Sequence, residues 1–375
     1  MMYFLSEGSV LKWLEAPSVY HIRGDELYEL DDEGFEFLRR CSSPLGCESG
    51  RNEFVDYCLA EGILTAEPVS TRRPPLIQSF FPSLRYLELQ ITEKCNLNCK
   101  HCYIGSRGRS ELSPARIRRV LTEFEEMQGL RVLITGGEPL LHSRFGEINE
   151  LLPDFQVRKI LCTNGMMLDE VILCNLHVDE IQVSVDGLEK AHESLRGRGT
   201  FGIAIESLGR ARDWGFEVSV STMVHPGNLQ DFNGMEKLFQ ELGVKDWTID
   251  IPCITGNLKD NTAFQMSPEQ GGRFLAYGTA GGVHGSASGF GCGLHLLCVT
   301  PHGLAAKCAF YSNSPLGRIE EGLRECRMRM KPVRLENLKC DCEHIESCRG
   351  GCRFRAELLG DPQGKDRYRC SLLLS

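Results

Sequence analysis

Three cysteines stand close together in the run Cys95-Asn96-Leu97-Asn98-Cys99-Lys100-His101-Cys102, directly after an apolar stretch. Three residues separate the first two cysteines, and two separate the next pair. Three thiolates on one loop can bind three irons of a 4Fe–4S cube, and the fourth iron stays open because no fourth cysteine is nearby. Such an iron can chelate the amine and carboxylate of a substrate. The alternatives are a redox dithiol or a zinc site, although structural zinc requires four ligands in paired spacing.

Eight more of the 18 cysteines gather near the end of the chain, also with ligand-like spacing. They are Cys292, Cys298, Cys308, Cys340, Cys342, Cys348, Cys352 and Cys370. The long chain has no export signal, which favours metal ligation over disulfides. Two zinc ribbons are the alternative, because eight thiolates also suit two tetrahedral zinc ions. We interpret the other seven mostly as small buried hydrophobes: Cys41, Cys47, Cys58, Cys162, Cys174, Cys253 and Cys326.

The composition of the 375-residue chain excludes several classes of function. A net charge of −9 argues against a nucleic-acid partner, since phosphate binding depends on an excess of Lys and Arg. The first residues do not resemble a signal peptide, and the sequence has no apolar run long enough to cross a membrane. We therefore expect a cytoplasmic protein that binds neither nucleic acid nor membrane.

The elements that must position the first cysteines alternate between strand and helix. Helices are expected at 114–128 and 201–214, among others, between six strands at 84–91, 132–135, 159–163, 180–186, 217–224 and 247–251. Six such units predict an α/β fold, a partial (β/α)6 barrel of parallel strands resembling a TIM barrel. Its chemistry should lie at the C-terminal strand ends.

The remaining chain divides at changes of composition. Residues 1–67 predict a winged-helix-like α+β module with a hairpin around Arg23-Gly24-Asp25, two helices and a short returning strand. Residues 68–82 form a Pro-rich linker, and the barrel covers 83–255. A Gly-rich connecting segment covers 256–290, and a cysteine-rich domain that should fold around metal covers 291–375.

The cysteine loop resembles that of the radical S-adenosylmethionine (SAM) superfamily. The resemblance implies that the open iron binds SAM, and that reductive cleavage yields a 5′-deoxyadenosyl radical that abstracts hydrogen from a substrate. It places His101 against adenine, and the Gly136-Gly137-Glu138-Pro139 turn at the SAM ammonium group. It also implies SAM contacts by residues at and near later strand ends: Asn164, Ser184, Asp186, Arg196 and Val224.

The C-terminal cysteines resemble the SPASM domain, which holds two auxiliary 4Fe–4S clusters in peptide-modifying radical SAM enzymes. The resemblance implies three clusters in total and a flavodoxin- or ferredoxin-type electron donor. It assigns Cys292, Cys298, Cys308 and Cys352 to the first auxiliary cluster. It assigns Cys340, Cys342, Cys348 and Cys370 to the second. The pair Cys340-Asp341-Cys342 departs from the usual spacing, which leaves the ligation of the second cluster open.

The residue after Cys308 is Ala309, where the similar sulfatase-maturing enzymes carry an Asp base. We therefore disfavour formylglycine formation. The candidate acid/base groups near the barrel mouth are Asp250, His225 and Cys253, and Asp250 and Cys253 are our candidate catalytic residues. A Cys253 thiol there could donate a hydrogen atom to a substrate radical, whereas core packing for Cys253 and a capping role for Asp250 are the alternatives.

The pattern of residues 1–67 resembles the peptide-recognition element of maturases that act on ribosomally made peptides. That element binds a leader peptide by adding it as a strand at an open sheet edge. We expect an enzyme that oxidises a precursor peptide to a thioether or carbon–carbon crosslink, or epimerises it. One alternative is a radical SAM/SPASM enzyme acting on a tetrapyrrole or another cofactor precursor. The other is a non-catalytic electron-transfer or scaffold protein.

Overall fold

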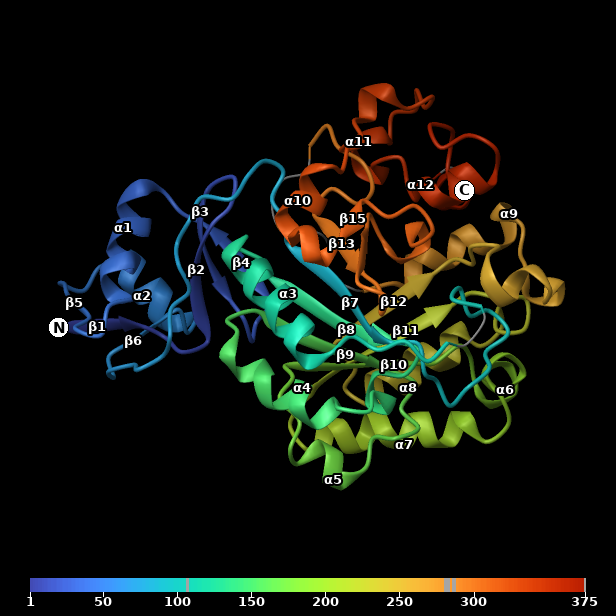
Figure 1. Cartoon of the computed structure of the whole chain (residues 1–375), viewed down its shortest axis with the longest axis horizontal. Helices are drawn as coiled ribbons and strands as arrows, with labels where there is room; N and C mark the ends of the chain where they lie inside the picture. The colour runs from blue at the N-terminus through green and yellow to red at the C-terminus, as the bar shows by residue number, and fades with distance from the viewer. Residues whose placement is uncertain (106–107, 280–283, 285–287, 374–375) are drawn as a thin grey trace.

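The computed structural model describes residues 1–105, 108–279, 284 and 288–373. Its centre is a mixed sheet of nine strands in the order β12-β11-β10-β9-β8-β7-β13-β14-β15 (Figure 1). The first six of these, β7 to β12, pair in parallel, as the sequence predicts. They are β7 (Tyr86–Thr92), β8 (Arg131–Gly136), β9 (Arg158–Thr163), β10 (Glu180–Ser184), β11 (Glu217–Met223) and β12 (Asp246–Asp250). The protein therefore contains the predicted partial barrel of parallel strands.

Helices cover the outer face of this sheet. They are α3 (Pro114–Glu126), α4 (Phe145–Leu151), α5 (Glu170–Leu173), α6 (Glu189–Arg196), α7 (Thr200–Asp213) and α8 (Phe232–Glu241). In α3, Ser113 caps the first turn by accepting a hydrogen bond from the Arg116 N–H, and Pro114 occupies the first position. The buried face of α3 includes Ile117 and Phe124, which belong to the same core as the apolar side chains of β7.

Strand β7 shows how the barrel separates its two faces. Its residues Leu87, Leu89 and Ile91 are buried in the helix-facing core. The alternate residues Glu88 and Gln90 must therefore point into the barrel. On this strand the barrel interior is therefore lined by polar side chains.

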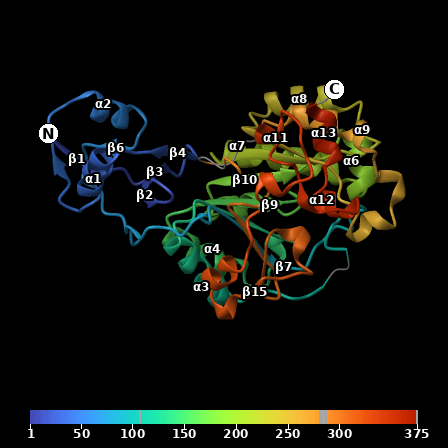
Figure 2. The same cartoon turned by 90° about the horizontal axis from the view of Figure 1, so that it is seen from above.

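The N-terminal module contains two small sheets and two helices. One sheet has the order β2-β3-β4 and the other β5-β1-β6. The strands are β1 (Met2–Leu5), β2 (Ser9–Trp13), β3 (Pro17–His21), β4 (Glu26–Glu29), β5 (Cys47–Glu48) and β6 (Leu64–Thr65), and the helices are α1 (Asp32–Cys41) and α2 (Glu53–Ala60). The expected hairpin is β3-β4, whereas β1 and β2 are not predicted from the sequence. In Figure 2, α1 and α2 lie at the opposite end of the molecule from α13 (Arg367–Leu373).

The sheet β2-β3-β4 is attached to the barrel at the N-terminal ends of its strands. The buried Lys12 ammonium donates to the carbonyl oxygens of Gly129 (2.7 Å) and Gln156 (3.3 Å). Asp25 pairs with Arg131, and the Arg158 guanidinium donates to the backbone carbonyls of Ile22 and Arg23. Losing one side of such buried polar contacts leaves charges uncompensated and costs several kcal/mol. This sheet is therefore part of the barrel's support.

The C-terminal region begins inside the barrel sheet. Strand β13 (Leu296–Val299) pairs in parallel with β7, and β14 (Leu304–Ala306) and β15 (Gly317–Arg318) extend the sheet in antiparallel fashion. Short helices follow: α10 (Leu323–Met328), α11 (Ile345–Cys348), α12 (Arg353–Leu358) and α13. Of the C-terminal cysteines, Cys292 and Cys348 line a cavity together with barrel residues such as Leu133 and Gln182. None of the helices in the described ranges is long and apolar enough to cross a membrane.

Candidate active site

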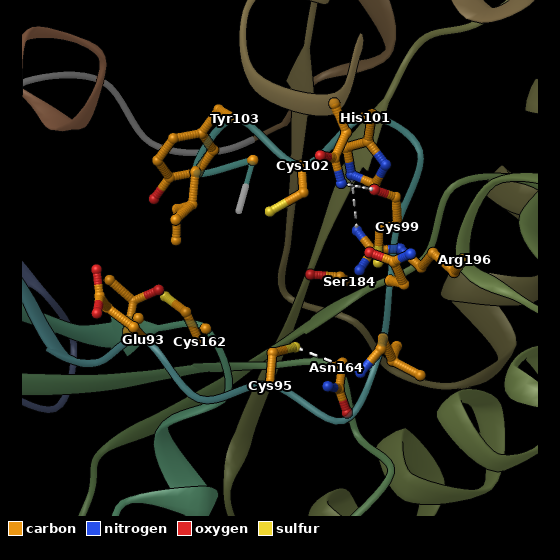
Figure 3. Close-up of a pocket in the computed structure, with 18 of the residues that line it drawn as sticks. Glu93, Cys95, Cys99, His101, Cys102, Tyr103, Cys162, Asn164, Ser184 and Arg196 are labelled. Atoms are coloured by element: carbon orange, nitrogen blue, oxygen red, sulfur yellow. Dashed lines mark hydrogen bonds between the residues drawn. The ribbon is translucent and has the colours of Figure 1, made fainter. Parts of the chain in front are cut away.

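A pocket lies at the C-terminal ends of β8, β9 and β10, and the three loop cysteines line it (Figure 3). Cys95, Cys99 and Cys102 stand around the pocket together with His101 and Arg196. A hydrogen bond fixes the start of the loop at the end of β7, where the Lys94 N–H donates to Thr92 Oγ1 at 3.1 Å. Three thiols of one loop around one pocket fit a cluster with one open iron.

A segment far away in the sequence also binds the cysteine loop. Asn257 donates from its backbone N–H to the Cys102 carbonyl and from its side chain to the Cys99 carbonyl, both at 2.9 Å. A Cβ on the neighbouring Gly256 would lie 2.2 Å from the Cys102 carbonyl oxygen. This close backbone approach explains the glycine. Asn257 itself lines the pocket.

The end of β8 approaches the cysteine loop so closely that side chains are excluded. Gly136 has a φ of 150°, and a Cβ on Gly137 would lie 2.3 Å from the Lys94 carbonyl oxygen. The Glu138 N–H donates to that same carbonyl at 2.7 Å. The two glycines thus bring β8 against the loop, and both line the pocket.

Glu138 is completely buried and joins two strand ends. One carboxylate oxygen accepts hydrogen bonds from Thr163 Oγ1 (2.8 Å) and the Leu140 N–H (3.2 Å), and the other accepts from the Asn164 N–H (2.9 Å). Burial raises the pKa of Glu138 to about 7, against the effect of these hydrogen bonds. A carboxylate has roughly four acceptor sites, so one remains for a further donor.

Asp186, which follows β10, pairs with Arg196 at the end of α6. The Arg196 guanidinium donates to the Asp186 carboxylate at 2.5 Å, and the Met223 N–H donates to its other oxygen at 2.7 Å. Burial alone would raise the pKa of Asp186, but the Arg196 charge holds that pKa well below its usual range. Arg196 also lies 3.5 Å from His101 Nε2. Burial lowers the pKa of His101 to about 4, so the ring is neutral at pH 7.

The predicted SAM-binding residues divide into two groups. Those that line the pocket are His101, Gly136, Gly137, Asn164, Ser184 and Arg196. Glu138, Pro139, Asp186 and Val224 lie behind this lining, within the described part of the chain. The side chain of Asn164 donates to Asn96 of the cysteine loop at 2.7 Å. The predicted SAM contacts themselves remain predictions.

The structure contains a group of buried polar side chains inside the barrel that was not predicted from the sequence. The Tyr103 hydroxyl lies 3.4 Å from Glu88 Oε1 and accepts a hydrogen bond from the Gln90 side chain at 3.0 Å. Burial raises the pKa of Glu88 above its usual value. The alternation of Glu88 and Gln90 with apolar residues in β7 is the signal that indicates this inward polar face.

The three candidate acid/base groups have different surroundings. Asp250 ends β12 and its side chain is exposed. His225 is fully buried, and its ring Nε2 lies 3.0 Å from the Asp186 carbonyl oxygen. Cys253 is also buried, beside Cys352. Asp250 is therefore the most accessible of the three.

The eight C-terminal cysteines lie in two groups, and the assignment of each group to one cluster remains a prediction. In one group Cys352 lies near Cys292 and Cys308, and Cys308 lies near Cys298. In the other, the Cys370 thiol lies near those of Cys340, Cys342 and Cys348. In a 4Fe–4S cube each thiolate binds a different iron, so the ligands surround a volume. Among the described residues, no three His, Cys, Asp or Glu side chains converge on a single-ion site.

The seven other cysteines are mostly buried, as interpreted, with two exceptions. Cys174 is exposed beyond the end of α5, where its thiol lies 3.2 Å from the Val171 carbonyl. Cys162 is half-buried and lines the pocket, because its position in β9 points into the barrel. Apolar burial is therefore wrong for these two residues.

Comparison with known proteins agrees with this geometry. Residues 89–239, which include the cysteine loop and the pocket-lining strand ends, match the family model of the radical SAM superfamily. An AdoMet-dependent heme synthase of Nitratidesulfovibrio vulgaris is 26% identical over 49% of this chain and 52% of its own length. The chain thus matches about half the length of that relative.

Two further proteins match over more of the chain. The mycofactocin maturase MftC of Mycobacterium ulcerans is 24% identical over 78% of this chain and 90% of its own length. The crystal structure of Streptococcus suis SuiB bound to precursor peptide SuiA superimposes with a TM-score of 0.67 at 14% identity. That superposition covers 97% of this chain and 98% of SuiB, and shows a common fold. Residues 89–239 thus form a radical SAM domain, and the three cysteines and strand ends that line the pocket lie within it.

Proposed function

We propose that this protein cleaves SAM reductively and uses the product to oxidise a precursor peptide that is made on the ribosome. Cys95, Cys99 and Cys102 would hold the 4Fe–4S cluster that supplies the electron for cleavage. The expected product is a thioether or carbon–carbon crosslink, and epimerisation is a further outcome of the same hydrogen abstraction. A flavodoxin- or ferredoxin-type protein would donate the electron.

The residues of this chain would bind and orient SAM. The backbone of Gly136 and Gly137 borders the pocket without side chains, so that SAM can approach the main chain. Arg196 brings a buried positive charge to the same pocket, suited to a carboxylate. The remaining acceptor site of Glu138 would receive an N–H of the SAM amino group.

We propose that the leader of the precursor peptide binds at the edge of β4 (Glu26–Glu29). In the sheet β2-β3-β4, β4 is an edge strand, and no other strand in the described ranges pairs with its outer side. The Leu30 N–H donates to the Pro17 carbonyl, so that pair is hydrogen-bonded across β3-β4. Because such pairs alternate, the N–H groups of Leu27 and Glu29 point outward. An extended leader peptide would pair with them.

The surface beside this edge can contact side chains of a leader. The Tyr28 and Tyr57 rings lie edge to face with centroids 6.1 Å apart, and Tyr57 is 49% exposed. Tyr28 is fixed by a 3.0 Å hydrogen bond to Glu61. Aromatic rings next to an open edge can bind apolar side chains of the added strand.

Glu29→Pro tests this binding mode, because it removes an outward N–H and leaves the β3-β4 hydrogen bonds in place. Deletion of the whole module would also expose the buried charges of the barrel. One lost main-chain hydrogen bond contributes about 0.5–1.5 kcal/mol, so affinity for the full precursor should fall about 2- to 12-fold. A precursor peptide encoded beside the gene would be the substrate in this test, and its modification would be followed by mass spectrometry.

Glu29→Ala is the matched control, since it removes the same exposed carboxylate but retains the N–H. It should process the precursor as the unaltered enzyme does, and both variants should cleave SAM normally without peptide. Equal loss in the two variants would mean that the edge does not bind the leader. Processing that is independent of the leader in all three proteins would contradict the peptide proposal itself.

A tetrapyrrole or another cofactor precursor is the second candidate substrate. The similarity to heme synthases favours it, although it covers about half of the chain. Anaerobic incubation with SAM and an iron porphyrin would yield a modified tetrapyrrole if this candidate is correct. The peptide encoded beside the gene would then remain unmodified.

A further inference from the structure

A cavity of about 600 Å³ lies inside the barrel, next to the SAM pocket and toward the N-terminal ends of the strands. Alternate residues of a strand face the same side, so one strand can line both spaces in turn. On β10, Glu180 and Gln182 line the cavity and Ser184 lines the SAM pocket. On β8, Leu133 lines the cavity and Thr135 lines the pocket. The cavity and the pocket are therefore successive layers of one barrel interior.

A side-chain contact joins the two layers. The sulfur of Cys162, which lines the SAM pocket, lies 3.7 Å from the side-chain oxygen of Gln182, which lines the cavity. From Glu180 to Ser184 the strand rises by about 13 Å, at about 3.3 Å per residue. A peptide of about four extended residues therefore spans the distance from the outer end of the cavity to the SAM pocket.

The outer end of the cavity reaches the strand that we propose to bind the leader. Asp25, in the turn between β3 and β4, lines the cavity. Its carboxylate accepts a hydrogen bond from Arg131 Nε at 2.7 Å, and its carbonyl oxygen lies 2.7 Å from His284 Nε2. Strand β4 begins at the next residue, Glu26, and none of its residues is among the described residues that line the cavity. A peptide on the edge of β4 thus comes closest to the cavity at the Glu26 end.

This connection determines the direction in which a leader must bind. The core of a precursor follows its leader, so it continues from the C-terminal end of the leader. Antiparallel pairing with β4 places that end beside Glu26 and Asp25, whereas parallel pairing places it beside Glu29, at the far end of the strand. Only an antiparallel leader therefore delivers the core to the cavity without a reversal of the chain.

The cavity wall that comes from the C-terminal region carries two guanidinium groups with unused donors. Arg349 lines the cavity and donates through Nε to the Phe290 carbonyl at 3.0 Å. Arg349 has a φ of 52°, which is uncommon for a bulky residue, so its backbone conformation does not explain the arginine. Arg369 also lines the cavity, and its side chain forms no hydrogen bond or ion pair with any described residue.

Carboxylates line the wall that comes from the barrel and the β3-β4 turn. Asp25 pairs with Arg131, and Glu180 accepts a hydrogen bond from Arg158 at 2.8 Å, so these two charges are compensated. The remaining carboxylate of this wall is that of Asp246, at the start of β12. The cavity is therefore acidic on the barrel side and cationic on the C-terminal side.

We propose that the segment of the precursor that follows the leader enters the barrel through this cavity, and that Arg349 and Arg369 bind an acidic side chain of that segment. The leader lies antiparallel to β4, and about four extended residues lead past Asp25 to the SAM pocket. A guanidinium group binds a carboxylate through two parallel hydrogen bonds, which fixes the geometry of the contact. This inference rests on the proposed peptide substrate and on its binding at β4.

Photocrosslinking tests the route and the direction. A precursor peptide encoded beside the gene would carry p-benzoylphenylalanine at one position at a time and would be irradiated with the full-length, anaerobically reconstituted enzyme. Mass spectrometry of the digest identifies the residue to which each label is attached. Labels early in the β4-binding part of the leader should attach near Glu29, and labels at its end near Glu26. Labels about two residues further on should attach near Gln182 or Thr248.

Two results would overturn the inference and leave the proposed function intact. The reverse order of labels along β4 would contradict the direction, and core labels that attach only outside the barrel would contradict the route. Attachment to neither β4 nor the cavity, together with processing that does not depend on the leader, would instead refute the proposed peptide function.

Arg369→Gln tests the cationic wall. Affinity for the fluorescently labelled precursor should fall about tenfold or more, because a charge-assisted hydrogen bond is lost. Arg367→Gln is the matched control on the same helix, since Arg367 is exposed and does not belong to the described lining of the cavity. It should bind the precursor as the unaltered enzyme does.

Changing the acidic residues of the precursor to Gln, one at a time, separates a contact from a structural effect. One such change should weaken binding to the unaltered enzyme but cause little further loss with Arg369→Gln, because the two changes remove the same interaction. Full additivity for every acidic residue would show that Arg369 does not bind the peptide, and would overturn the proposed contact. If Arg369→Gln does not fold, Arg349→Gln completes the same cycle.

Discussion

Glu138→Gln should weaken SAM binding and remove a pH dependence from it. The buried carboxylate accepts three hydrogen bonds, which leaves one of its roughly four acceptor sites for the proposed contact with SAM. A hydrogen bond to a charged group contributes about 1.5–3 kcal/mol, so the dissociation constant for SAM should rise about 10- to 150-fold. Iron content should not change, because Glu138 is not a predicted ligand of any cluster.

The sign of the pH dependence follows from the raised pKa. With a pKa of about 7 in the empty site, Glu138 is mostly ionised at pH 8 and mostly protonated at pH 6. If the SAM ammonium group pairs with the ionised carboxylate, affinity should fall about tenfold between pH 8 and pH 6. The Gln side chain does not titrate, and titration of SAM itself affects both proteins equally. The difference between their two profiles therefore isolates Glu138.

The assay is calorimetric titration of SAM into anaerobically reconstituted protein at several pH values. Glu138→Gln also places an amide donor against the Asn164 N–H, so its stability should fall. Thr163→Val is the comparison variant, since it removes one internal hydrogen bond to the same carboxylate but retains the carboxylate, so the dissociation constant for SAM should change less than in Glu138→Gln. If both variants bind SAM like the unaltered protein, Glu138 only joins β8 to β9, and the assignment of a SAM contact is refuted.

Three further predictions concern the cluster, the buried ion pair and the barrel mouth. Replacing all three loop cysteines with Ala should remove about four irons and all SAM cleavage, and residual cleavage or zinc in place of iron would contradict the cluster assignment. Arg196→Gln should cost about 3–5 kcal/mol in the free energy of unfolding at pH 7, measured with denaturant, because it leaves Asp186 buried without its partner. That loss should shrink as the pH falls below about 4, where the unfolded carboxyl takes up a proton and the pair no longer favours the folded state. Asp250→Asn should reduce peptide modification at least tenfold and leave SAM cleavage in the absence of peptide unchanged, and equal loss of both reactions would assign Asp250 a structural role.

The contacts between the N-terminal module and the barrel determine where a leader peptide bound at β4 would lie. Lys12 and Asp25 make buried contacts with the barrel, and Glu15 forms an ion pair with Arg85 of the barrel. The edge of β4 lies on the same small sheet, so a bound leader would be held in a fixed position relative to the barrel. Point changes at Glu29 test binding without disturbing these contacts.

The sequence by itself determined the elements whose signals are local. Cys95, Cys99 and Cys102 sit on one loop, so their spacing alone indicates a cluster with an open iron. The alternation of strands and helices determined the parallel barrel, and Gly136 with Gly137 marked a close backbone approach. Strands β1 and β2 were not predicted. Most of their residues are buried on both faces, Lys12 among them, so the two strands show no alternation of polar and apolar residues.

The tertiary structure decided which distant groups meet, because sequence spacing carries no information about contacts between separate elements. Only the fold brings Asn257 to the cysteine loop and Cys253 to Cys352, 99 positions further along the chain. The pairing of Asp186 with Arg196 likewise depends on how α6 returns to the end of β10. Burial then sets the charge state of each group, as it does for Glu138, and burial is a property of the packed molecule alone.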